Sequence, residues 1–300
     1  MSDKPHILLL GATGQVGHAL RDPLSAIGTV TAATRDDADL ADEASLRTLV
    51  RTTAPDIIVN AAAYTAVDQA EDEPERAMAI NGLASGILAE EAARLDAWMV
   101  HYSTDYVFDG QKRTPYTEDD TPSPLGVYGR TKRAGEKAIQ QVGGGRPLIV
   151  RTSWVSSLRR SNFLRTMLRL AHDHDVLTVV DDQTGCPTWA GWIADATTEM
   201  LTTILDRDDP AGDSGVYHLS SAGSTTWCGF ARAIFERFGK SVRVDPIATE
   251  DYPTKAERPR YSVLDTQRVQ QRFGLRVPSW QEQLDACTRH AKTMNVSPDP

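Results

Sequence analysis

A short apolar run followed at once by a glycine-rich turn constrains this chain more than any other feature of its 300 residues. Residues 7–10 are uninterrupted Ile and Leu, which is typical of a strand buried on both faces of a parallel sheet. Gly11, Gly14 and Gly17 follow, and a helix is predicted over residues 15–24. Strand, glycine turn and helix start together predict a dinucleotide-binding unit, because glycines let the backbone approach a pyrophosphate and a helix N-terminus attracts it. The spacing is G-x-x-G-x-x-G rather than G-x-G-x-x-G, so a tight turn without a ligand is the competing interpretation.

The rest of the chain continues as alternating strands and helices and then loosens after Trp154. Strands are predicted at residues 29–34, 55–63, 98–102 and 147–150, with helices between them, and this rhythm predicts an α/β fold with a Rossmann-like doubly wound parallel sheet. We expect a dinucleotide-binding domain of residues 1–153 with a returning segment at about 188–222. A smaller C-terminal α/β substrate-binding domain is expected from about 154–187 and 223–300.

The end of the second predicted strand carries groups that bear on the choice of dinucleotide. A site that prefers NAD usually has an acidic residue there, whereas the first charged residue here is Arg35. Arg35 favours a 2′-phosphate and therefore NADPH, and an arginine in a solvated loop is the alternative. Asp39 and Leu40 lie where the chain should pass the adenine, although Asp39 equally suits the cap of a helix over residues 43–51.

Small residues end the third predicted strand. Ala61, Ala62 and Ala63 leave room for a cofactor at the carboxyl end of the sheet, or they simply pack under a helix. Asn81 interrupts a long helical stretch, residues 74–95, where asparagine is an unfavourable choice. A surface position is predicted for Asn81, and a role in holding backbone or water near the site is the alternative.

Tyr128 and Lys132 are four residues apart, so in a helix they lie on one face, one turn apart. A phenol has a pKa of about 10, and a neighbouring ammonium lowers it, so the pair can exchange a proton with a carbonyl or hydroxyl group. An ordinary amphipathic helix is the alternative. Thr104, at the carboxyl end of a strand, either hydrogen-bonds the same carbonyl or satisfies turn backbone. Asp105 either binds a sugar hydroxyl or caps a turn.

Bulk properties exclude several classes of partner. The net charge of −9 argues against a nucleic acid or an acidic membrane surface. No apolar run approaches the roughly 20 residues that span a bilayer, and residues 1–6 lead into the first strand without the apolar region of a signal peptide. The three cysteines, Cys186, Cys228 and Cys287, are isolated and are expected to be reduced thiols. We therefore expect a cytoplasmic protein.

These features resemble the extended short-chain dehydrogenase/reductase superfamily. The general resemblance rests on Gly11, Gly14 and Gly17 with Thr104, Tyr128 and Lys132. A narrower one, to the family of dTDP-4-dehydrorhamnose reductases, covers most of the chain in order, at residues 58–68, 101–108, 123–132, 151–155, 182–188, 217–219 and 225–227.

The narrower resemblance implies NADPH-dependent reduction of the 4-keto group of dTDP-4-dehydro-6-deoxy-L-mannose to dTDP-L-rhamnose, a precursor of cell-envelope glycans such as lipopolysaccharide, with NADH as an open alternative. It implies that Tyr128 donates the proton, that Lys132 holds the nicotinamide ribose and lowers the pKa of Tyr128, and that Thr104 orients the carbonyl. Implied substrate contacts are Thr104, Asp105, Trp154 and Arg258, the last at the substrate diphosphate. Implied cofactor contacts are Gly11, Thr13, Gly14, Gln15, Val16, Asp39, Leu40, Ala61, Ala62, Ala63, Thr65, Tyr102, Tyr128 and Lys132, to which the charge argument adds Arg35.

One departure from the family concerns metal and assembly. Some members carry a glutamate early in the first helix that helps a magnesium ion bridge a dimer, whereas residues 16–20 contain no acid here. No metal is therefore expected, and we expect a monomer or a weak homodimer.

The sequence carries features that bear on two other functions. An epimerase or dehydratase of the same superfamily would use tightly bound NAD, but Tyr106 stands where a dehydratase has a second acid. A non-catalytic regulatory relative should have lost Tyr128 or Lys132, and both are present.

Overall fold

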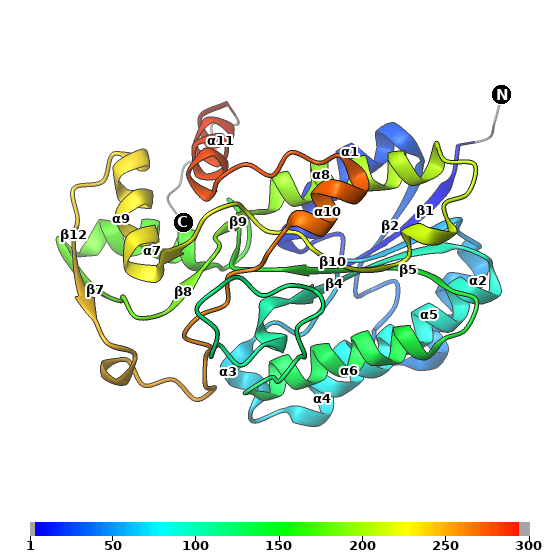
Figure 1. Ribbon diagram of the computed structural model, residues 1–300, viewed down its shortest axis with the longest axis horizontal. Helices are drawn as coiled ribbons and strands as arrows, with labels where there is room; N and C mark the ends of the chain where they lie inside the picture. Colours follow the sequence, from blue (N-terminus) through cyan, green and yellow to red (C-terminus); the bar gives the residue numbers. More distant parts are fainter. Residues whose placement is uncertain (1–3, 294–300) are drawn as a thin grey trace.

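A six-stranded parallel sheet organises the computed structural model, which describes residues 4–293 (Figure 1). The strand order is β10-β5-β4-β3-β1-β2, so β2 and β3 flank β1 and the chain changes direction across the sheet at that point. Ligands of open α/β sheets bind beyond the carboxyl ends of the strands at such a switch point. The six strands are β1 (His6–Leu10), β2 (Thr29–Ala33), β3 (Ile57–Asn60), β4 (Trp98–Thr104), β5 (Arg146–Thr152) and β10 (Gly215–His218).

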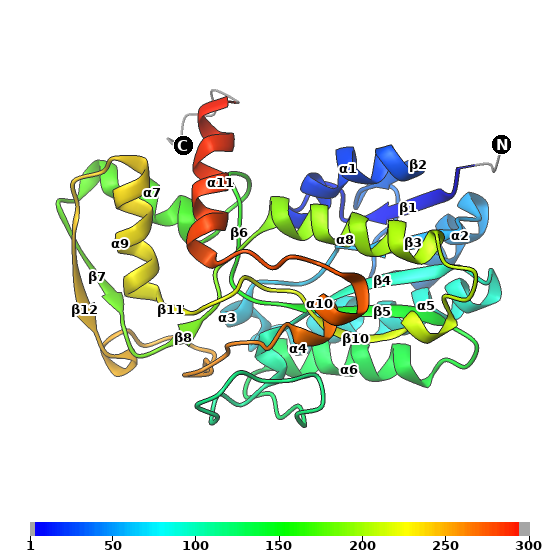
Figure 2. The same cartoon turned by 45° about the horizontal axis from the view of Figure 1, so that its top comes forward.

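Helices cover both faces of this sheet, which makes it a three-layer structure (Figures 1 and 2). Leu9 of β1 packs against the helices on one face of the sheet, and Leu8 packs against the helices on the other face. This follows because successive side chains of a strand point to opposite faces. That geometry explains why β1 is apolar throughout. One face carries α1 (Gln15–Ile27), α8 (Ala190–Leu205) and α10 (Gln267–Phe273), and the other carries α2 (Glu43–Thr53), α5 (Ala84–Arg94) and α6 (Val127–Gln141).

The glycine turn after β1 is shaped by two close approaches. Gly11 has φ +72°, and a Cβ there would lie 2.6 Å from the backbone nitrogen of Ala62. A Cβ on Gly17 would lie 2.1 Å from the backbone oxygen of Gly11, so the first turn of α1 can pack this tightly on the strand only with glycine. Gly14 is the N-cap of α1 and provides no side-chain hydrogen bond, which leaves the first N–H groups of the helix for an anion.

Two other helix starts correct or extend the sequence analysis. Asp42, not Asp39, caps α2, by accepting a hydrogen bond from the backbone nitrogen of Ser45 at 3.1 Å. The start of α6 at Gly126 has no side-chain cap of its own. Instead, Glu71 Oε1 accepts a hydrogen bond from the backbone nitrogen of Val127 at 2.7 Å, so a distant acid stabilises the helix that carries Tyr128.

The surface position predicted for Asn81 is wrong. The stretch 74–95 is not one helix but α4 (Pro74–Met78), a π-helical turn η1 (Ala79–Leu83) and α5. Asn81 lies in the π-turn, where its side chain is buried, with Oδ1 accepting from Tyr64 N at 2.9 Å and Nδ2 donating to Tyr64 O at 3.0 Å and to Thr131 Oγ1 at 3.1 Å. Asn81 therefore ties the loop after β3 to α6, which is a structural reason for a residue of low helix propensity.

A smaller C-terminal layer has its own apolar core. It contains α7 (Phe163–Asp173), α9 (Trp227–Phe238), α11 (Trp280–Thr293) and the parallel pair β7 (Val176–Val180) and β12 (Arg243–Ile247). Leu168, Phe230 and Leu284 meet in this core. The remaining short elements are α3 (Val67–Ala70), β6 (Val155–Ser156), β8 (Thr184–Gly185), β9 (Thr188–Trp189), β11 (Thr225–Thr226), η2 (Asp105–Val107), η3 (Ala211–Asp213) and η4 (Thr249–Asp251).

Between β9 and β11 the chain leaves the smaller region and returns to the large sheet. Helix α8 packs along α1, and β10 joins the sheet beside β5 at its edge. The predicted fold class, a Rossmann-like parallel sheet with a smaller C-terminal region, is confirmed. Within residues 4–293 the structure has no helix of the length and apolarity needed to cross a membrane.

Candidate active site

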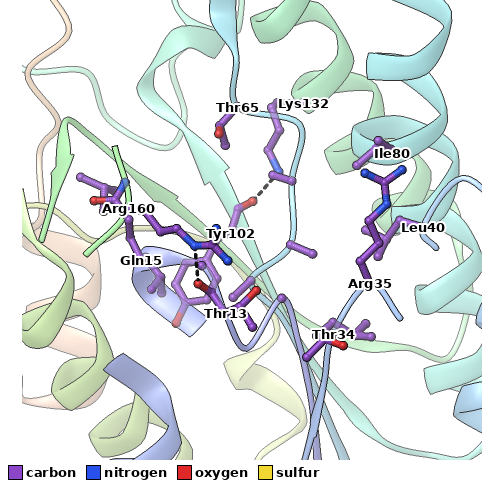
Figure 3. Close-up of a pocket in the computed structure, with 18 of the residues that line it drawn as sticks. Thr13, Gln15, Thr34, Arg35, Leu40, Thr65, Ile80, Tyr102, Lys132 and Arg160 are labelled. Atoms are coloured by element: carbon purple, nitrogen blue, oxygen red, sulfur yellow. Dashed lines mark hydrogen bonds between the residues drawn. The ribbon is translucent and has the colours of Figure 1, made fainter. Parts of the chain in front are cut away.

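A cavity of about 600 Å³ opens at the carboxyl ends of β1, β3 and β4 (Figure 3). Every residue predicted as a cofactor contact lies in its wall, from the glycine turn to the face of α6. The wall consists of Leu10, Gly11, Thr13, Gly14, Gln15, Val16, Thr34, Arg35, Ala38, Asp39, Leu40, Ala61, Ala62, Ala63, Thr65, Ile80, Tyr102, Ser103, Tyr128, Lys132, Thr152, Val155, Arg160 and Ser161. These residues run from Leu10 to Ser161, so segments far apart in the sequence come together here.

The wall also contains residues that the sequence analysis missed. Ser103 directly precedes Thr104 at the end of β4, so its position at the strand end was the signal that could have found it. Arg160 had no such signal, because it lies in an irregular loop and reaches the site only through the fold. Its Nε donates to the backbone oxygen of Thr13 at 2.9 Å, which holds the loop against the glycine turn. The others missed are Leu10, Thr34, Ala38, Ile80, Thr152, Val155 and Ser161.

The residues present fit a dinucleotide. The cavity has a volume within the usual range for small-molecule sites, and its phosphate end is open because the glycines there carry no side chain. The uncapped first turn of α1 faces this end with free N–H groups. Arg35 stands at the rim, 67% exposed and paired with Asp39 at 3.1 Å, so its guanidinium can turn to a phosphate without leaving a buried charge behind.

Tyr128 and Lys132 lie one turn apart on α6, as the sequence predicted. The ring of Tyr128 meets that of Tyr106 edge to face, with centroids 5.8 Å apart. Burial raises the pKa of Tyr128 to about 12, and a hydrogen bond with Thr104 opposes that rise. The four-residue spacing predicted that Lys132 lowers this pKa, but burial is the larger effect in the structure.

Lys132 is almost fully buried in the wall of the cavity. Its Nζ donates to the backbone oxygen of Tyr102 at 2.6 Å (Figure 3). The same Nζ lies 3.3 Å from Nε2 of His101. Burial lowers the pKa of Lys132 to about 8, and the negative charge of Glu136 opposes that fall. An ammonium group held this way can change its protonation state near neutral pH.

Thr104 and Asp105 form a buried polar corner at the end of β4. The Thr104 hydroxyl caps η2, accepting from the backbone nitrogen of Tyr106 at 3.1 Å, and it donates to Asp105 Oδ1 at 3.1 Å. The turn role considered for Thr104 is therefore present in the structure. Asp105 also accepts from Ser153 Oγ at 2.9 Å, and burial raises its pKa to about 6.

The predicted substrate contacts Thr104, Asp105, Trp154 and Arg258 lie outside the wall of the cofactor cavity. Trp154 stacks on Trp227 with ring centroids 3.4 Å apart, in a backbone conformation of φ +44°. Arg258 forms an ion pair with Asp68 at 2.7 Å. Burial raises the pKa of Tyr106, the neighbour of Tyr128, and the positive charge of Arg258 opposes that rise. No group of three or more potential ligand side chains that could hold a metal ion occurs among residues 4–293.

A glycine turn at a sheet switch point and a Tyr–Lys pair in one cavity define a class, the extended short-chain dehydrogenases/reductases, which are dinucleotide-dependent oxidoreductases. Within that class the chain belongs to the RmlD substrate binding domain family, whose model matches residues 5–293. The predicted family is confirmed.

Individual relatives agree over nearly the whole chain. A dTDP-4-dehydrorhamnose reductase from Burkholderia thailandensis is 45% identical over 293 residues, covering 94% of this chain and 98% of the relative. The one from Escherichia coli is 44% identical over 286 residues, covering 92% and 94%. The crystal structure of dTDP-4-dehydrorhamnose reductase from Bacillus anthracis in complex with NADP superposes with a TM-score of 0.89 at 32% identity, covering 96% of this chain and 99% of the other.

Proposed function

We propose that this protein is an NADPH-dependent dTDP-4-dehydrorhamnose reductase, which reduces the 4-keto group of dTDP-4-dehydro-6-deoxy-L-mannose to give dTDP-L-rhamnose. The observation that carries the proposal is the placement of Tyr128 and Lys132 on the wall of a dinucleotide-sized cavity, opposite the glycine turn. The relatives that are similar to this chain over almost its whole length carry the name of that activity.

The proposed roles of the side chains follow from their geometry. When bound, the reduced nicotinamide supplies the hydride. Tyr128 gives its hydroxyl proton to the sugar carbonyl oxygen as that oxygen gains negative charge, a kind of help that contributes roughly 10²- to 10⁴-fold. Thr104, whose hydroxyl opposes the rise in the pKa of Tyr128, orients the same carbonyl. Lys132 holds the ribose next to the nicotinamide. In its ammonium form it also stabilises the phenolate that Tyr128 becomes.

Substrate binding is proposed for the groups beyond the cofactor cavity. Asp105 accepts hydrogen bonds from sugar hydroxyls, Trp154 packs against the sugar–nucleotide portion, and Arg258 binds the diphosphate. Arg258 is half-buried and already balanced by Asp68, so a diphosphate would compete with an existing carboxylate for it. The division into a dinucleotide-binding domain of residues 1–153 and about 188–222 and a substrate-binding domain of residues about 154–187 and 223–300 stays a prediction, and Thr104 and Asp105 of the first domain are proposed to reach the substrate.

NADPH is the proposed cofactor, with NADH as the weaker alternative. Arg35 at the rim suits a 2′-phosphate, and the related protein of known structure holds NADP. A monomer or weak homodimer without a metal, located in the cytoplasm, stays a prediction.

The test is a turnover assay with two sugar nucleotides. Purified protein is expected to oxidise NADPH when given dTDP-4-dehydro-L-rhamnose and to do so poorly with a UDP-linked 4-ketosugar, followed by the loss of NADPH absorbance and by identification of dTDP-L-rhamnose. The Tyr128→Phe protein is the matched control for background oxidation. Equal rates on the two sugar nucleotides would overturn the substrate assignment.

A further inference from the structure

A chain of polar groups lies directly behind Lys132, and the mechanism above makes no use of it. Asn60 ends β3 and His101 lies beside it on β4; both side chains are 1% exposed. Asn60 Nδ2 lies 3.2 Å from His101 Nδ1, and His101 Nε2 lies 3.3 Å from Lys132 Nζ. Buried polar side chains almost always have hydrogen-bond partners. The donor and acceptor of each hydrogen bond between Asn60, His101 and Lys132 therefore follow from their chemistry.

The direction is set by a backbone group that can only donate. The N–H of Ala62 points to Asn60 Oδ1 at 3.2 Å. Because that N–H cannot act as an acceptor, the amide of Asn60 has to present its oxygen to Ala62 and its NH₂ to His101. Rotating the amide of Asn60 by half a turn would bring its NH₂ against the N–H of Ala62, and two donors would then face each other in a buried place.

This orientation determines the tautomer of His101. Nδ1 has to accept the hydrogen bond from Asn60, so the single proton of the neutral imidazole is on Nε2. A doubly protonated ring is disfavoured, since burial and the charge of Lys132 hold the pKa of His101 well below its usual value. His101 therefore points an N–H, not a lone pair, at Lys132 Nζ.

A donor aimed at Nζ affects the two forms of Lys132 differently. A neutral amine has a lone pair that can accept from His101, whereas an ammonium has none. The other charged group that acts on Lys132 is Glu136, one turn further along α6, whose carboxylate is already held by Arg151 of β5 and by Arg133. The polar side chains on the strand side of Lys132 carry no charge. They are His101 of β4, which contacts Nζ, and Asn60 of β3 behind it.

Resting on the function proposed above, we propose that Ala62, Asn60 and His101 form a positioning relay that fixes the Nε2–H tautomer and disfavours the ammonium form of Lys132. Lys132 then exchanges its proton with water of the cavity near neutral pH. After Tyr128 has given a proton to the substrate, Lys132 can return one to the phenolate, and the amine that remains takes a proton from solvent. The relay touches neither substrate nor reacting atoms, and it acts through Lys132.

The first test reads the tautomer directly and does not depend on activity. The protein is labelled with ¹⁵N in its seven histidine rings, and the signals of His101 are assigned by their loss in His101→Gln. A neutral ring protonated on Nε2 at about pH 7 is expected, as the geometry requires. A ring protonated on Nδ1, or an imidazolium, would overturn the proposal. The exposed His174, changed to Gln, is the control for assignment.

The second test changes what faces Nζ. Asn60→Asp offers an acceptor to both Ala62 and His101, so the ring should carry its proton on Nδ1 and Nε2 should accept from the ammonium. His101→Leu removes the donor without adding charge. In both variants the basic limb of the pH profile of kcat should move upward, by about one pH unit for Asn60→Asp and about half a unit for His101→Leu.

The outcomes separate this inference from the proposed function. A basic limb that stays in place in His101→Leu, with wild-type turnover of the dTDP-ketosugar intact, would overturn the relay alone. A wild-type protein that does not reduce the ketosugar would overturn the function, while the tautomer measurement would still decide the orientation of His101. If either variant fails to fold, the other variant and the wild-type spectrum still decide the question.

Discussion

Arg151 and Glu136 form a buried, doubly hydrogen-bonded ion pair between β5 and α6. Arg151 Nε donates to Glu136 Oε1 and Nη2 donates to Oε2, each at 2.8 Å, and the side chains are only 2% and 0% exposed. The Ser103 hydroxyl adds a hydrogen bond to Oε1 at 2.6 Å. Glu136 therefore fastens the helix that carries Tyr128 and Lys132 to the strand ends that complete the cavity.

Replacing Glu136 should be among the most destabilising single changes in the active-site helix. Glu136→Gln leaves Arg151 buried without its counter-charge, and breaking a buried pair in this way costs about 3–5 kcal/mol. Urea unfolding should show that loss, together with a lower melting temperature. Glu90→Gln is the matched control, because Glu90 pairs with Arg47 while 55% exposed, and such surface pairs contribute at most about 1 kcal/mol. Equal losses in the two variants would mean that burial of the pair is not what matters.

Removing one hydroxyl should separate catalysis from cofactor binding. Tyr128→Phe keeps the ring that packs on Tyr106 but cannot donate a proton, so kcat should fall by at least about a hundredfold. The affinity for NADPH, measured by fluorescence titration, should stay within about threefold of the wild type. Tyr252→Phe, at a side chain that is 60% exposed, should leave both quantities unchanged. Near-normal turnover in Tyr128→Phe would remove Tyr128 from its proposed role.

Arg35 should set the preference between the two dinucleotides. Arg35→Leu removes the guanidinium proposed to meet the 2′-phosphate, so KM for NADPH should rise by roughly tenfold while KM for NADH changes little, since charged hydrogen bonds of this kind contribute about 1.5–3 kcal/mol. Steady-state kinetics with both cofactors give the ratio. Arg76→Leu is the control, because Arg76 is also an exposed arginine with an acidic partner and does not line the cavity. An unchanged ratio in Arg35→Leu would place the 2′-phosphate elsewhere.

Much of this site was predictable because its parts are local. The apolar run of β1, the glycine turn and the four-residue spacing of Tyr128 and Lys132 each depend on a few consecutive residues, and strand and helix periodicity place them without knowledge of the fold. A local signal also marks the end of α9, where Gly239 has φ +65°, a conformation that glycine adopts readily.

Other features could not be predicted because distant partners determine them. Asn81 is unfavourable in a helix by propensity, yet Tyr64 and Thr131 satisfy its amide inside a π-turn. Arg160 reaches the cavity from a loop without a motif. The pKa of Tyr128 is governed by burial, which a four-residue spacing does not reveal. The strand β12 went unpredicted because it contains Pro246 and alternates poorly, and its pairing with β7 supplies what the local pattern lacks.

Asp105 should make the stability of the protein fall as the pH rises from about 4 to about 6. Its pKa is raised to about 6 by burial, from an ordinary value of 3.8, so between these values the folded protein holds a proton that the unfolded chain has lost. Stability due to this group is therefore fully present below the lower value and lost as the pH passes the higher one, by about 2–3 kcal/mol in total. Asp105→Asn does not titrate and keeps hydrogen-bonding groups for Thr104 and Ser153, so it should gain roughly that much on the wild type between about pH 4 and about pH 7. Urea unfolding of both proteins across this range measures the difference, and a constant difference would show that Asp105 titrates alike in the folded and unfolded states.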